Sequence, residues 1–600
     1  MTKEITDKKQ LKTANKIKSR QTWSVLFKHL HGYWKDTILT WVFCLMECVT
    51  EVLVAFFIQY LIDDVKASNL NGIYMYSGVI AVLAIFSAVM GILAGYWAAS
   101  AASGFGKNLR EAMFVHVQDY SFANIDKFSS ASIVTRTTTD VTNVQNAFQM
   151  IIRAVIRAPL IMVFALIMCF ITEWKLAWIF LIIIPVILAL LLFIASKAHP
   201  IFVDIFNRYD GLNSDVQEDV DGIRVVKSFD REDYQDQKFY KASNYIHDHF
   251  IKAEKMLAFN NPIMNIAVYG ATIAIGWIGS MLIINSNGSE LSIGGLTTLI
   301  TYIMMIMMSM MMVTMVYVSI IIARNSAERI TEIITEKPSI ASPMNPIMKV
   351  PSGAVEFKNV DFSYNPGKNV LTGINLSFTS GMTVGIIGST GSGKTTLVSL
   401  LARLYDVTSG SVSIGGIDVR KYDLAVLRDS VAVVLQKNTL FTGTIKDNLK
   451  WGNPNATDDE LQKACDLAQA SGFINGFPQK LDTMLDEGGT NVSGGQKQRL
   501  CIARALLKNP KVLVLDDSTS ACDTHTDSLI RKGLSETRHD VTKFVIAQRV
   551  LSIKDCDTIV VMNEGKVIAQ GNHEGLMKNC SVYSELYQSQ LGGGDFDASH

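Results

Sequence analysis

The chain has 600 residues, more than one ordinary domain, and 49% of them are hydrophobic while only 18% are charged. The formal net charge is zero, so nothing attracts the chain generally to nucleic acid, and we expect no nucleic-acid partner. The eight cysteines form no metal-ligand spacing such as CxxC. Because the apolar excess lies in residues 1–325, the composition predicts a membrane half followed by a soluble half.

Residues 1–35 are predicted to form a cytoplasmic N-terminal segment. It is basic, with Lys8, Lys9, Lys12, Lys16, Lys18 and Arg20. The first apolar run of the chain, which follows this segment, is longer than the core of a signal peptide, and no small-residue cleavage site follows it, so we expect no cleaved signal.

Residues 36–332 are predicted to form a transmembrane domain, because about 20 apolar residues in a helix suffice to cross a bilayer. Six runs meet this condition: 38–62, 73–102, 150–171, 174–196, 258–284 and 294–323. Long, charged connections follow the second and fourth runs, and they are predicted to be helices that continue into water.

The distribution of lysine and arginine predicts the orientation. The N-terminal segment and both long connections are rich in these residues, whereas the short connections are poor in them. The positive-inside rule then places the N-terminus, the long connections and the soluble half in the cytoplasm of a multi-pass plasma-membrane protein.

Two acidic residues, Glu47 and Glu51, lie within the first run, four residues apart and hence on one helix face. Charge at that depth costs roughly 2.5–3.5 kcal/mol or more, so it should face a cavity or a partner. One hypothesis is an acidic patch that attracts cationic substrates. The alternative is internal pairing with Arg153 and Arg157, which have the same spacing in the third run.

The last run is dense in methionine, whose flexible, polarizable thioethers suit promiscuous binding surfaces. The run contains Met304, Met305, Met307, Met308, Met310, Met311, Met312 and Met315. These residues cover every face of a helix, so only some of them can line a pathway. We take Met304, Met308 and Met311 as substrate candidates; ordinary packing or lipid contact is the alternative.

Residues 333–352 are spaced by prolines and are predicted to be a linker, followed by a soluble domain over 353–590 and a flexible tail over 591–600. Within the domain, an apolar strand over 383–387 precedes a glycine-rich loop and a helix. The loop and the helix start comprise Gly388, Ser389, Thr390, Gly391, Ser392, Gly393, Lys394, Thr395 and Thr396. This strand, loop and helix predict a phosphate-binding loop whose backbone N–H groups surround phosphate oxygens, with Lys394 on the β/γ oxygens and Thr395 on Mg²⁺.

Two further motifs follow the phosphate loop. The segment Val492-Ser493-Gly494-Gly495-Gln496 comes first, and an apolar strand over 511–515 then ends in Asp516 and Asp517.

This set in this order resembles the nucleotide-binding domain of ABC transporters. The resemblance extends from about residue 20 to 590 and is to the half-transporters of the type IV (B-family) exporters. The fold that it implies is six long transmembrane helices, all α, followed by an α/β P-loop NTPase domain with a helical subdomain around 440–510. The cofactors that it implies are ATP and Mg²⁺.

The resemblance also implies roles for individual residues. Tyr364 matches the aromatic residue that stacks on adenine, with a core tyrosine as the alternative. Asp516 and Gln436 match Mg²⁺-side residues, Gln436 also contacting the attacking water. Ser493, Gly495 and Gln496 match the segment that binds the ATP of an opposing subunit, and residues 520–523 match the loop that crosses between the two ATPase domains. Residues 122–128 and 217–229 resemble coupling segments that dock on the ATPase.

The chain departs from the family at two catalytic positions. Asp517 stands where the family usually has Glu, and Gln548 stands where it has His. Asp is one methylene shorter than Glu, and misplacement by about 1 Å costs about a hundredfold in rate. Gln can hydrogen-bond but cannot titrate or carry charge.

These departures predict that ATP is bound firmly and hydrolysed slowly. The resemblance then implies a heterodimer with a second half-transporter that has Glu and His at these positions, although a homodimer that tolerates Asp and Gln is an alternative. The predicted function is export of hydrophobic or cationic drug-like compounds from the cytoplasmic side. Lipid or peptide export, and an ATP-gated regulatory or channel-like protein, are the alternatives.

Overall fold

The computed structural model describes residues 22–592 except 287, 366, 519 and 520. The basic residues of the N-terminal segment, Ser520 of the crossing loop and tail residues 593–600 therefore lie outside the described residues. The chain divides into two compact units. The first combines Met1–Gln118 with Ser130–Glu336, and the second combines Asp119–Ser129 with Lys337–His600.

The first unit is helical and contains the membrane spans. Among the described residues, six helical segments are long and apolar enough to cross a bilayer: Trp34–Lys66, Leu70–Gln118, Ser130–Thr172, Trp174–Phe202, Glu232–Asn285 and Ile293–Val313. Each coincides with one of the six expected runs, so the prediction of six apolar helices is confirmed.

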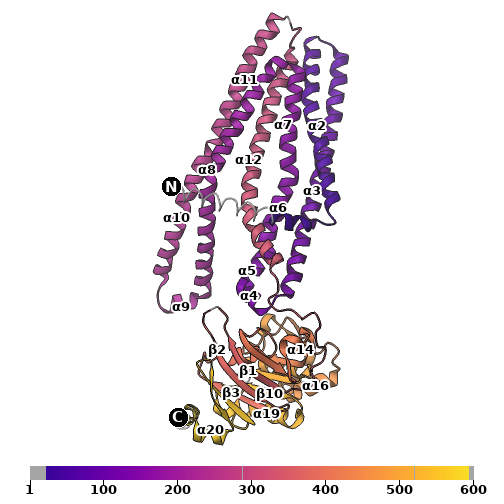
Figure 1. Ribbon diagram of the computed structural model, residues 1–600. Helices are drawn as coiled ribbons and strands as arrows, with labels where there is room; N and C mark the ends of the chain where they lie inside the picture. Colours follow the sequence, from indigo (N-terminus) through magenta and orange to yellow (C-terminus); the bar gives the residue numbers. More distant parts are fainter. Residues whose placement is uncertain (1–21, 287, 366, 519–520, 593–600) are drawn as a thin grey trace. The chain divides into compact units, whose positions relative to one another are not determined.

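Several helices of this unit, drawn in Figure 1, extend well beyond the expected apolar runs. The helices of the unit are α2 (Trp34–Lys66), α3 (Leu70–Gln118), α5 (Ser130–Thr135), α6 (Val141–Met150), α7 (Ile156–Thr172), α8 (Trp174–Asp221), α9 (Ile223–Ser228), α10 (Glu232–Ala258), α11 (Asn260–Asn285) and α12 (Ile293–Thr335), with π-helical turns η1 (Arg136–Asp140) and η2 (Ile151–Val155). As expected, the long charged connections are helices that extend the spans.

Small side chains bring the first two spans close together. Ala94, Ala98, Ala101 and Ala102 of α3 are all fully buried, and α2 is the main packing partner of α3. Small residues allow helix backbones to approach closely in a membrane, where van der Waals packing replaces the hydrophobic effect as the driving force. Helix α8 packs along α10 and α11 instead, and the short α9 forms the turn between α8 and α10.

A buried ion pair fixes η1 against α12. Asp140 is almost fully buried and accepts hydrogen bonds from Arg329 Nε (2.7 Å), Arg329 Nη2 (2.5 Å) and Ser326 Oγ (2.8 Å). A buried carboxylate is tolerated only where its charge is balanced and its oxygens are hydrogen-bonded, and both conditions hold here.

The second unit contains two main sheets. The strands are β1 (Val355–Phe362), β2 (Leu371–Phe378), β3 (Thr383–Gly388), β4 (Ser409–Ile414), β5 (Ile417–Asp418), β6 (Val431–Val434), β7 (Gly443–Thr444), β8 (Met484–Leu485), β9 (Val512–Asp516), β10 (Thr542–Ile546), β11 (Thr558–Asn563) and β12 (Lys566–Gly571). The six-stranded sheet has the order β12-β11-β3-β10-β9-β6 and is parallel except for β12. An antiparallel sheet has the order β2-β1-β4-β5.

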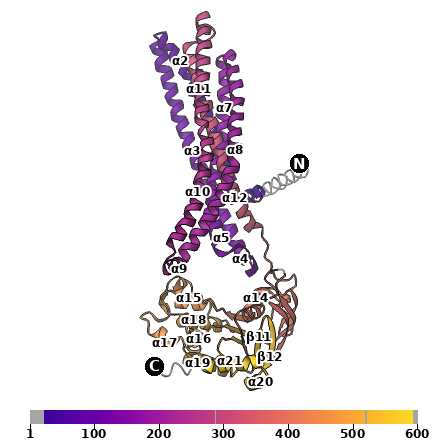
Figure 2. The ribbon, with the colours of Figure 1, turned by 90° about the vertical axis from the view of Figure 1, so that its left-hand side faces the viewer.

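Helices surround these sheets: α13 (Lys394–Ser399), α14 (Leu424–Ser430), α15 (Ile445–Lys450), α16 (Asp458–Leu467), α17 (Ser471–Asn475), α18 (Gly494–Leu507), α19 (Thr524–Thr537), α20 (His573–Asn579) and α21 (Ser581–Gly592). Figure 2 shows α15, α16, α17 and α18 grouped at the side of the unit away from β11 and β12. This group forms the helical subdomain expected around 440–510. The fold class, six long apolar helices followed by an α/β domain, is confirmed.

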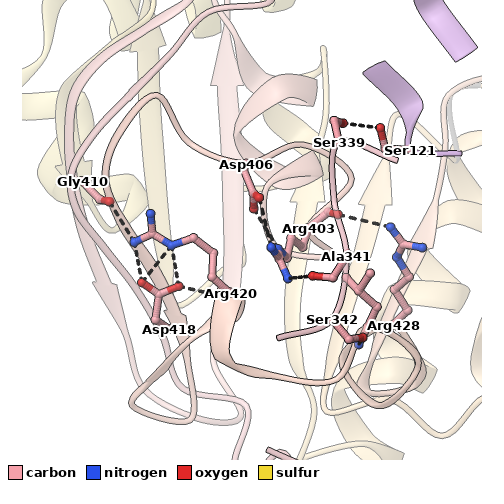
Figure 3. Close-up of polar contacts among 11 residues, drawn as sticks. Ser121, Ser339, Ala341, Ser342, Arg403, Asp406, Gly410, Asp418, Arg420 and Arg428 are labelled. Atoms are coloured by element: carbon pink, nitrogen blue, oxygen red, sulfur yellow. Dashed lines mark hydrogen bonds and ion pairs between the residues drawn. The ribbon is translucent and has the colours of Figure 1, made fainter. Parts of the chain in front are cut away.

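The short helix α4 (Phe122–Phe128) packs within this second unit. Tyr405 Oη donates a hydrogen bond to Asp126 Oδ2 (2.7 Å), and Asn124 Nδ2 donates to the carbonyl of Lys337 (3.1 Å). Ser121 and Ser339 share a hydroxyl contact of 2.5 Å, while Arg403 Nη1 donates to the carbonyl of Ala341 (3.2 Å) (Figure 3). The start of the linker and one expected coupling segment are thus fixed on the ATPase unit.

Replacing Arg329 with Met should destabilise the membrane unit, because Asp140 would remain buried without its counter-charge. Removing one partner of a buried ion pair lowers the free energy of unfolding by about 3–5 kcal/mol. Because the Arg329 side chain is half-exposed, we expect a loss near the lower value, about 3 kcal/mol. Thermal unfolding in detergent measures the change. The double variant Arg329→Met with Asp140→Asn should regain part of the loss, and equal destabilisation of the single and double variants would contradict the pairing.

Candidate nucleotide site

The predicted site residues lie at one edge of the six-stranded sheet. Strands β3, β10, β9 and β6 are neighbouring and parallel, so their carboxyl ends meet at the same edge. Gly388 ends β3, Asp516 ends β9, and Gln548 and Gln436 each follow the end of a strand by two residues. The sheet thereby brings together residues that are up to 160 positions apart in sequence.

The phosphate loop has the backbone that its glycines allow. Gly391 and Gly393 have φ angles of +83° and +93°, a left-handed conformation that side chains disfavour. A Cβ atom at Gly388 would collide with the carbonyl oxygen of Met562. The Lys394 Nζ donates to the carbonyls of Gly388 (2.9 Å) and Ser389 (2.8 Å), so the ammonium lies inside the loop. Burial lowers the pKa of Lys394, and the nearby Asp516 and Asp517 oppose this effect.

Asp516 and Thr395 fit a Mg²⁺ ion. Asp516 is 2% exposed, its Oδ2 is buried without a hydrogen-bond partner, and the Thr395 side chain hydrogen-bonds its carboxylate. Burial raises the pKa of Asp516, and the adjacent Asp517 adds to the rise. Mg²⁺ prefers a few hard oxygen ligands together with substrate phosphates and water, and a hydroxyl beside an unsatisfied carboxylate oxygen supplies such ligands.

The two unusual residues, Asp517 and Gln548, contact each other directly. Gln548 Nε2 donates to Asp517 Oδ2 at 2.8 Å, and Gln436 Nε2 approaches the same oxygen at 3.5 Å. Asp517 has a φ of +48°, and its backbone N–H donates to the carbonyl of Ile546 (3.1 Å). Asp tolerates this left-handed conformation better than most residues. The mutual contact was not deduced from the sequence, because it depends on the order of the strands.

Tyr364 has an accessible ring. It is 47% exposed, and its hydroxyl lies 3.1 Å from Thr396 Oγ1 at the start of α13. The ring meets Phe362 and Tyr405 edge-on, with centroid distances of 4.8 and 5.1 Å. Half of the ring remains free beside the phosphate loop, so stacking on adenine stays a prediction with suitable geometry.

The segment Ser493–Gln496 begins α18. Ser493 caps the helix: its Oγ accepts from Gln496 N (3.3 Å), and Gln496 Oε1 accepts from Ser493 N (2.9 Å). This capping box satisfies backbone donors that the helix leaves unpaired. Ser493 is exposed and Gly495 partly so, which leaves the segment open to a ligand.

In the membrane unit, the glutamates of α2 meet an arginine of α7. Arg157 Nη2 lies 2.8 Å from Glu51 Oε1, 2.9 Å from Glu51 Oε2 and 3.4 Å from Glu47 Oε1. Glu47 is 7% exposed, and its Oε2 is buried without a hydrogen-bond partner. Between the described residues, no ion pair joins Arg153 to either glutamate. Internal pairing therefore forms through Arg157 alone, and one negative charge of this cluster exceeds its positive charge.

The methionines of α12 separate into an exposed and a buried set. The three substrate candidates are all exposed, Met308 most strongly at 72%, and Met315 joins them, whereas Met307 and Met310 are buried. The exposed residues are spaced by four, three and four positions, so they form one stripe on the helix. Met305, on the same helix, packs against a cluster that contains Cys44 and Cys48 of α2, which places the start of the stripe near the depth of Glu47.

Fold and site together define a membrane-spanning P-loop ATPase, and comparisons with known proteins agree. Residues 37–310 match the family model for the ABC transporter transmembrane region, and residues 371–520 match the ABC transporter model. An ABC transporter ATP-binding protein of Bacillus subtilis, YfiB, is 32% identical over 91% of this chain and 95% of its own length. The ATP-dependent lipid A-core flippase of Desulfotalea psychrophila is 32% identical over 81% of this chain and 84% of its own.

A solved structure described as a bacterial Atm1-family ABC exporter with ATP bound shares the fold. It has a TM-score of 0.79 at 23% identity and covers 94% of this chain and 99% of that chain. The chain belongs to the ABC transporter family, with a transmembrane and an ATP-hydrolysing domain in one polypeptide.

Mg²⁺-dependent nucleotide binding should weaken in mild acid. Only ionised Asp516 can hold the cation, and its raised pKa means that it protonates at a higher pH than an ordinary Asp. Titration of a fluorescent ATP analogue with and without Mg²⁺, at a series of pH values, measures the effect. At neutral pH, the Asp516→Asn variant should bind the analogue in the presence of Mg²⁺ at least about tenfold more weakly than the wild-type chain. Full Mg²⁺ dependence in this variant would exclude Asp516 as a ligand.

Proposed function

We propose that this chain is one half of a heterodimeric ABC exporter, and that its own nucleotide site binds ATP but hydrolyses it slowly. The observation that carries the proposal is the 2.8 Å contact between Gln548 Nε2 and Asp517 Oδ2. In hydrolysis a carboxylate must hold a water in line with the γ-phosphate. The carboxylate at the matching position is Asp517, which directly follows Asp516 at the end of β9.

Asp517 is poorly suited to that task for two reasons. Its side chain is one methylene short, and misplacement by about 1 Å costs about a hundredfold in rate. The amides of Gln548 and Gln436 also occupy or approach its Oδ2, and an oxygen that accepts a hydrogen bond is a weaker base. Gln548 is uncharged, so it supplies no positive charge to stabilise the negative charge that develops on the phosphate during hydrolysis.

The residues that bind nucleotide are retained. When bound, Mg²⁺ would neutralise phosphate charge, and Thr395 and Asp516 are placed to hold it. Lys394, the loop N–H groups and Tyr364 bind and orient ATP without taking part in proton transfer. A partner half-transporter with Glu and His at the equivalent positions would carry most of the turnover, using Ser493, Gly495 and Gln496 of this chain in its own site.

A short chain of contacts links the adenine side of the site to α4. Tyr364 meets the Tyr405 ring edge-on, and the Tyr405 hydroxyl donates to Asp126. The Phe122 ring also contacts Tyr405, at a centroid distance of 6.1 Å. When the site closes on ATP, these contacts would displace α4. We infer that α4 transmits this displacement to the spans.

The substrate is proposed to be an amphipathic, hydrophobic or cationic small molecule, moved outward from the cytoplasmic side of the plasma membrane. The exposed stripe of Met304, Met308 and Met311 offers it a soft apolar surface. The excess negative charge of Glu47, Glu51 and Arg157 at the same depth would favour a cation.

Lipid export is the second candidate, and the 32% identity to a lipid A-core flippase favours it. Peptide export and an ATP-gated regulatory or channel-like protein have no comparable support. An assay with a dye-like cation and a fluorescent phospholipid in the same reconstituted vesicles separates the first two candidates.

Restoring the family residues should increase turnover. The double variant Asp517→Glu with Gln548→His should hydrolyse ATP about ten- to a hundredfold faster than the wild-type chain. Each single variant should gain much less, because both positions act on one transition state. Phosphate release is measured in lipid, both for the chain alone and for the complex in which it co-purifies from its native cell.

Lys394→Met added to the double variant is the matched control and should abolish the gain. Rapid, sustained phosphate release by the wild-type chain alone, or no gain on restoration, would contradict a catalytic defect at these positions.

Glu47→Gln should selectively impair export of cations. It removes the excess negative charge while the Arg157–Glu51 pair remains, so the fold should persist. Vesicle transport of a cationic dye should fall about threefold to tenfold, which corresponds to about 0.7–1.4 kcal/mol, while transport of a neutral dye should stay constant. Ile266→Ala, at an exposed position of α11, controls for substitution in a span. Equal loss for both dyes would assign Glu47 a structural role.

A further inference from the structure

A second hollow lies in the ATPase unit between the six-stranded sheet and α19. Its volume is about 350 Å³. Its walls contain the cations Arg531, Lys532 and Lys543, and one carboxylate, Asp555. Hydroxyl groups come from Thr383, Ser528, Ser535 and Ser552, and the apolar part of the wall is formed by Leu515, Leu534, Val545 and Cys556. None of the polar side chains in these walls was assigned a role by the motifs of the sequence.

The central cation is Lys543 of β10. Its residue is 5% exposed. Lys543 lies two positions before Val545, on the same face of the strand, and both line the hollow, so Lys543 occupies a position where an apolar residue is expected. Across the described residues, no hydrogen bond or ion pair reaches its ammonium. An ammonium on a largely buried side chain, with no counter-ion of its own, gains most from an anion that compensates its charge.

A second unsatisfied donor lies in the same wall. Arg531 pairs with Asp527 (Nη2 to Oδ2, 3.0 Å) and donates to the carbonyl of Ser552 (Nη1, 2.9 Å). Its Nε is nevertheless buried without a hydrogen-bond partner. Two cationic groups from different elements, β10 and α19, thus both retain unused donors at one hollow.

The acidic groups around the hollow do not satisfy these donors. Asp555 is the one carboxylate in the wall. Asp557 and Asp540 act on Lys543 only as distant charges, and Asp557 Oδ2 accepts from the backbone N–H of Thr383 (2.7 Å). Burial accordingly lowers the pKa of Lys543 despite these carboxylates.

The hollow is separate from the nucleotide site. Lys543 and Thr383 lie at the amino ends of β10 and β3, whereas the phosphate loop and Gln548 follow the carboxyl ends. Gln548 lies two residues beyond the end of β10, and the three steps of strand from Lys543 to Ile546 alone span roughly 10 Å.

We propose that this hollow binds a small organic oxyanion, a carboxylate or phosphate monoester on a compact apolar body. The oxyanion pairs with the Lys543 ammonium and accepts from Arg531 Nε, while the apolar body lies against Leu515, Leu534 and Val545. Bound in this way, the anion joins α19 to β10.

The test uses the full-length chain in lipid nanodiscs with the nucleotide site saturated by a non-hydrolysable Mg²⁺–ATP analogue. Phenyl phosphate and benzoate are the anionic probes, and benzyl alcohol is the uncharged control. Binding is measured by calorimetry and by the shift of the unfolding temperature. Lys543→Met keeps the length and the apolar stem of the side chain, and Lys358→Met, at an exposed lysine of β1, is the matched control.

The wild-type chain and Lys358→Met should bind at least one anionic probe and not benzyl alcohol. Lys543→Met should bind that probe at least tenfold more weakly, and without probe it should unfold at the same or a higher temperature because an unpaired buried charge is removed. The proposal is overturned if neither anion binds at about 10 mM, if Lys543→Met binds equally well, or if Lys543→Met lowers the unfolding temperature without probe and thus shows a structural role. Because none of these measurements involves hydrolysis or transport, their failure leaves the proposed export function untouched.

Discussion

The parallel alignment of β3, β10, β9 and β6 is the constraint on which the nucleotide site depends. The central strands of this group are wholly buried: all five residues of β9 and all five of β10 are shielded from solvent, and most of them are apolar. A strand that is buried on both faces can neither slip nor turn over without exposing that surface. The polar residues that follow each strand are therefore held at one edge, where burial raises the pKa of Asp516.

The membrane unit meets a different requirement, because buried charge there cannot be satisfied by water. Asp140 is matched by Arg329, and Glu51 by Arg157, in pairs that join helices far apart in sequence. Glu47 Oε2 and Arg157 Nε of this cluster are buried without hydrogen-bond partners. Because charged groups are costly within a membrane, this cluster departs from a simple packing of apolar helices.

Much of this structure could be predicted from the sequence, and the limits have physical causes. The six spans and the glycine loop are local patterns of length and spacing, so they were recognisable before folding was considered. Met304, Met308 and Met311 were chosen from the sequence as substrate candidates, and all three are exposed, but the sequence could not show which face of α12 the other helices cover. The pairing of Arg157 rather than Arg153 with the glutamates depends on how α7 and its π-helical turn are rotated against α2.

Lys543 shows the same limit in the soluble unit. A single lysine in the strand Thr542–Ile546 carries no motif, and only the position of α19 over the sheet makes it a buried charge beside a hollow. Long-range packing, rather than local pattern, decides whether such a residue is solvated.

The two departures from the family residues are best understood as one change. A shorter carboxylate at 517 leaves space that the longer amide of Gln548 fills with a 2.8 Å hydrogen bond, and Asp is well suited to the left-handed backbone at this position. The strand ends therefore keep a direct hydrogen bond between positions 517 and 548, where the family usually has Glu and His. A satisfied Asp–Gln contact, beside an intact phosphate loop and an intact Asp516, is what a site requires if its task is to hold ATP and close upon it rather than to cleave it.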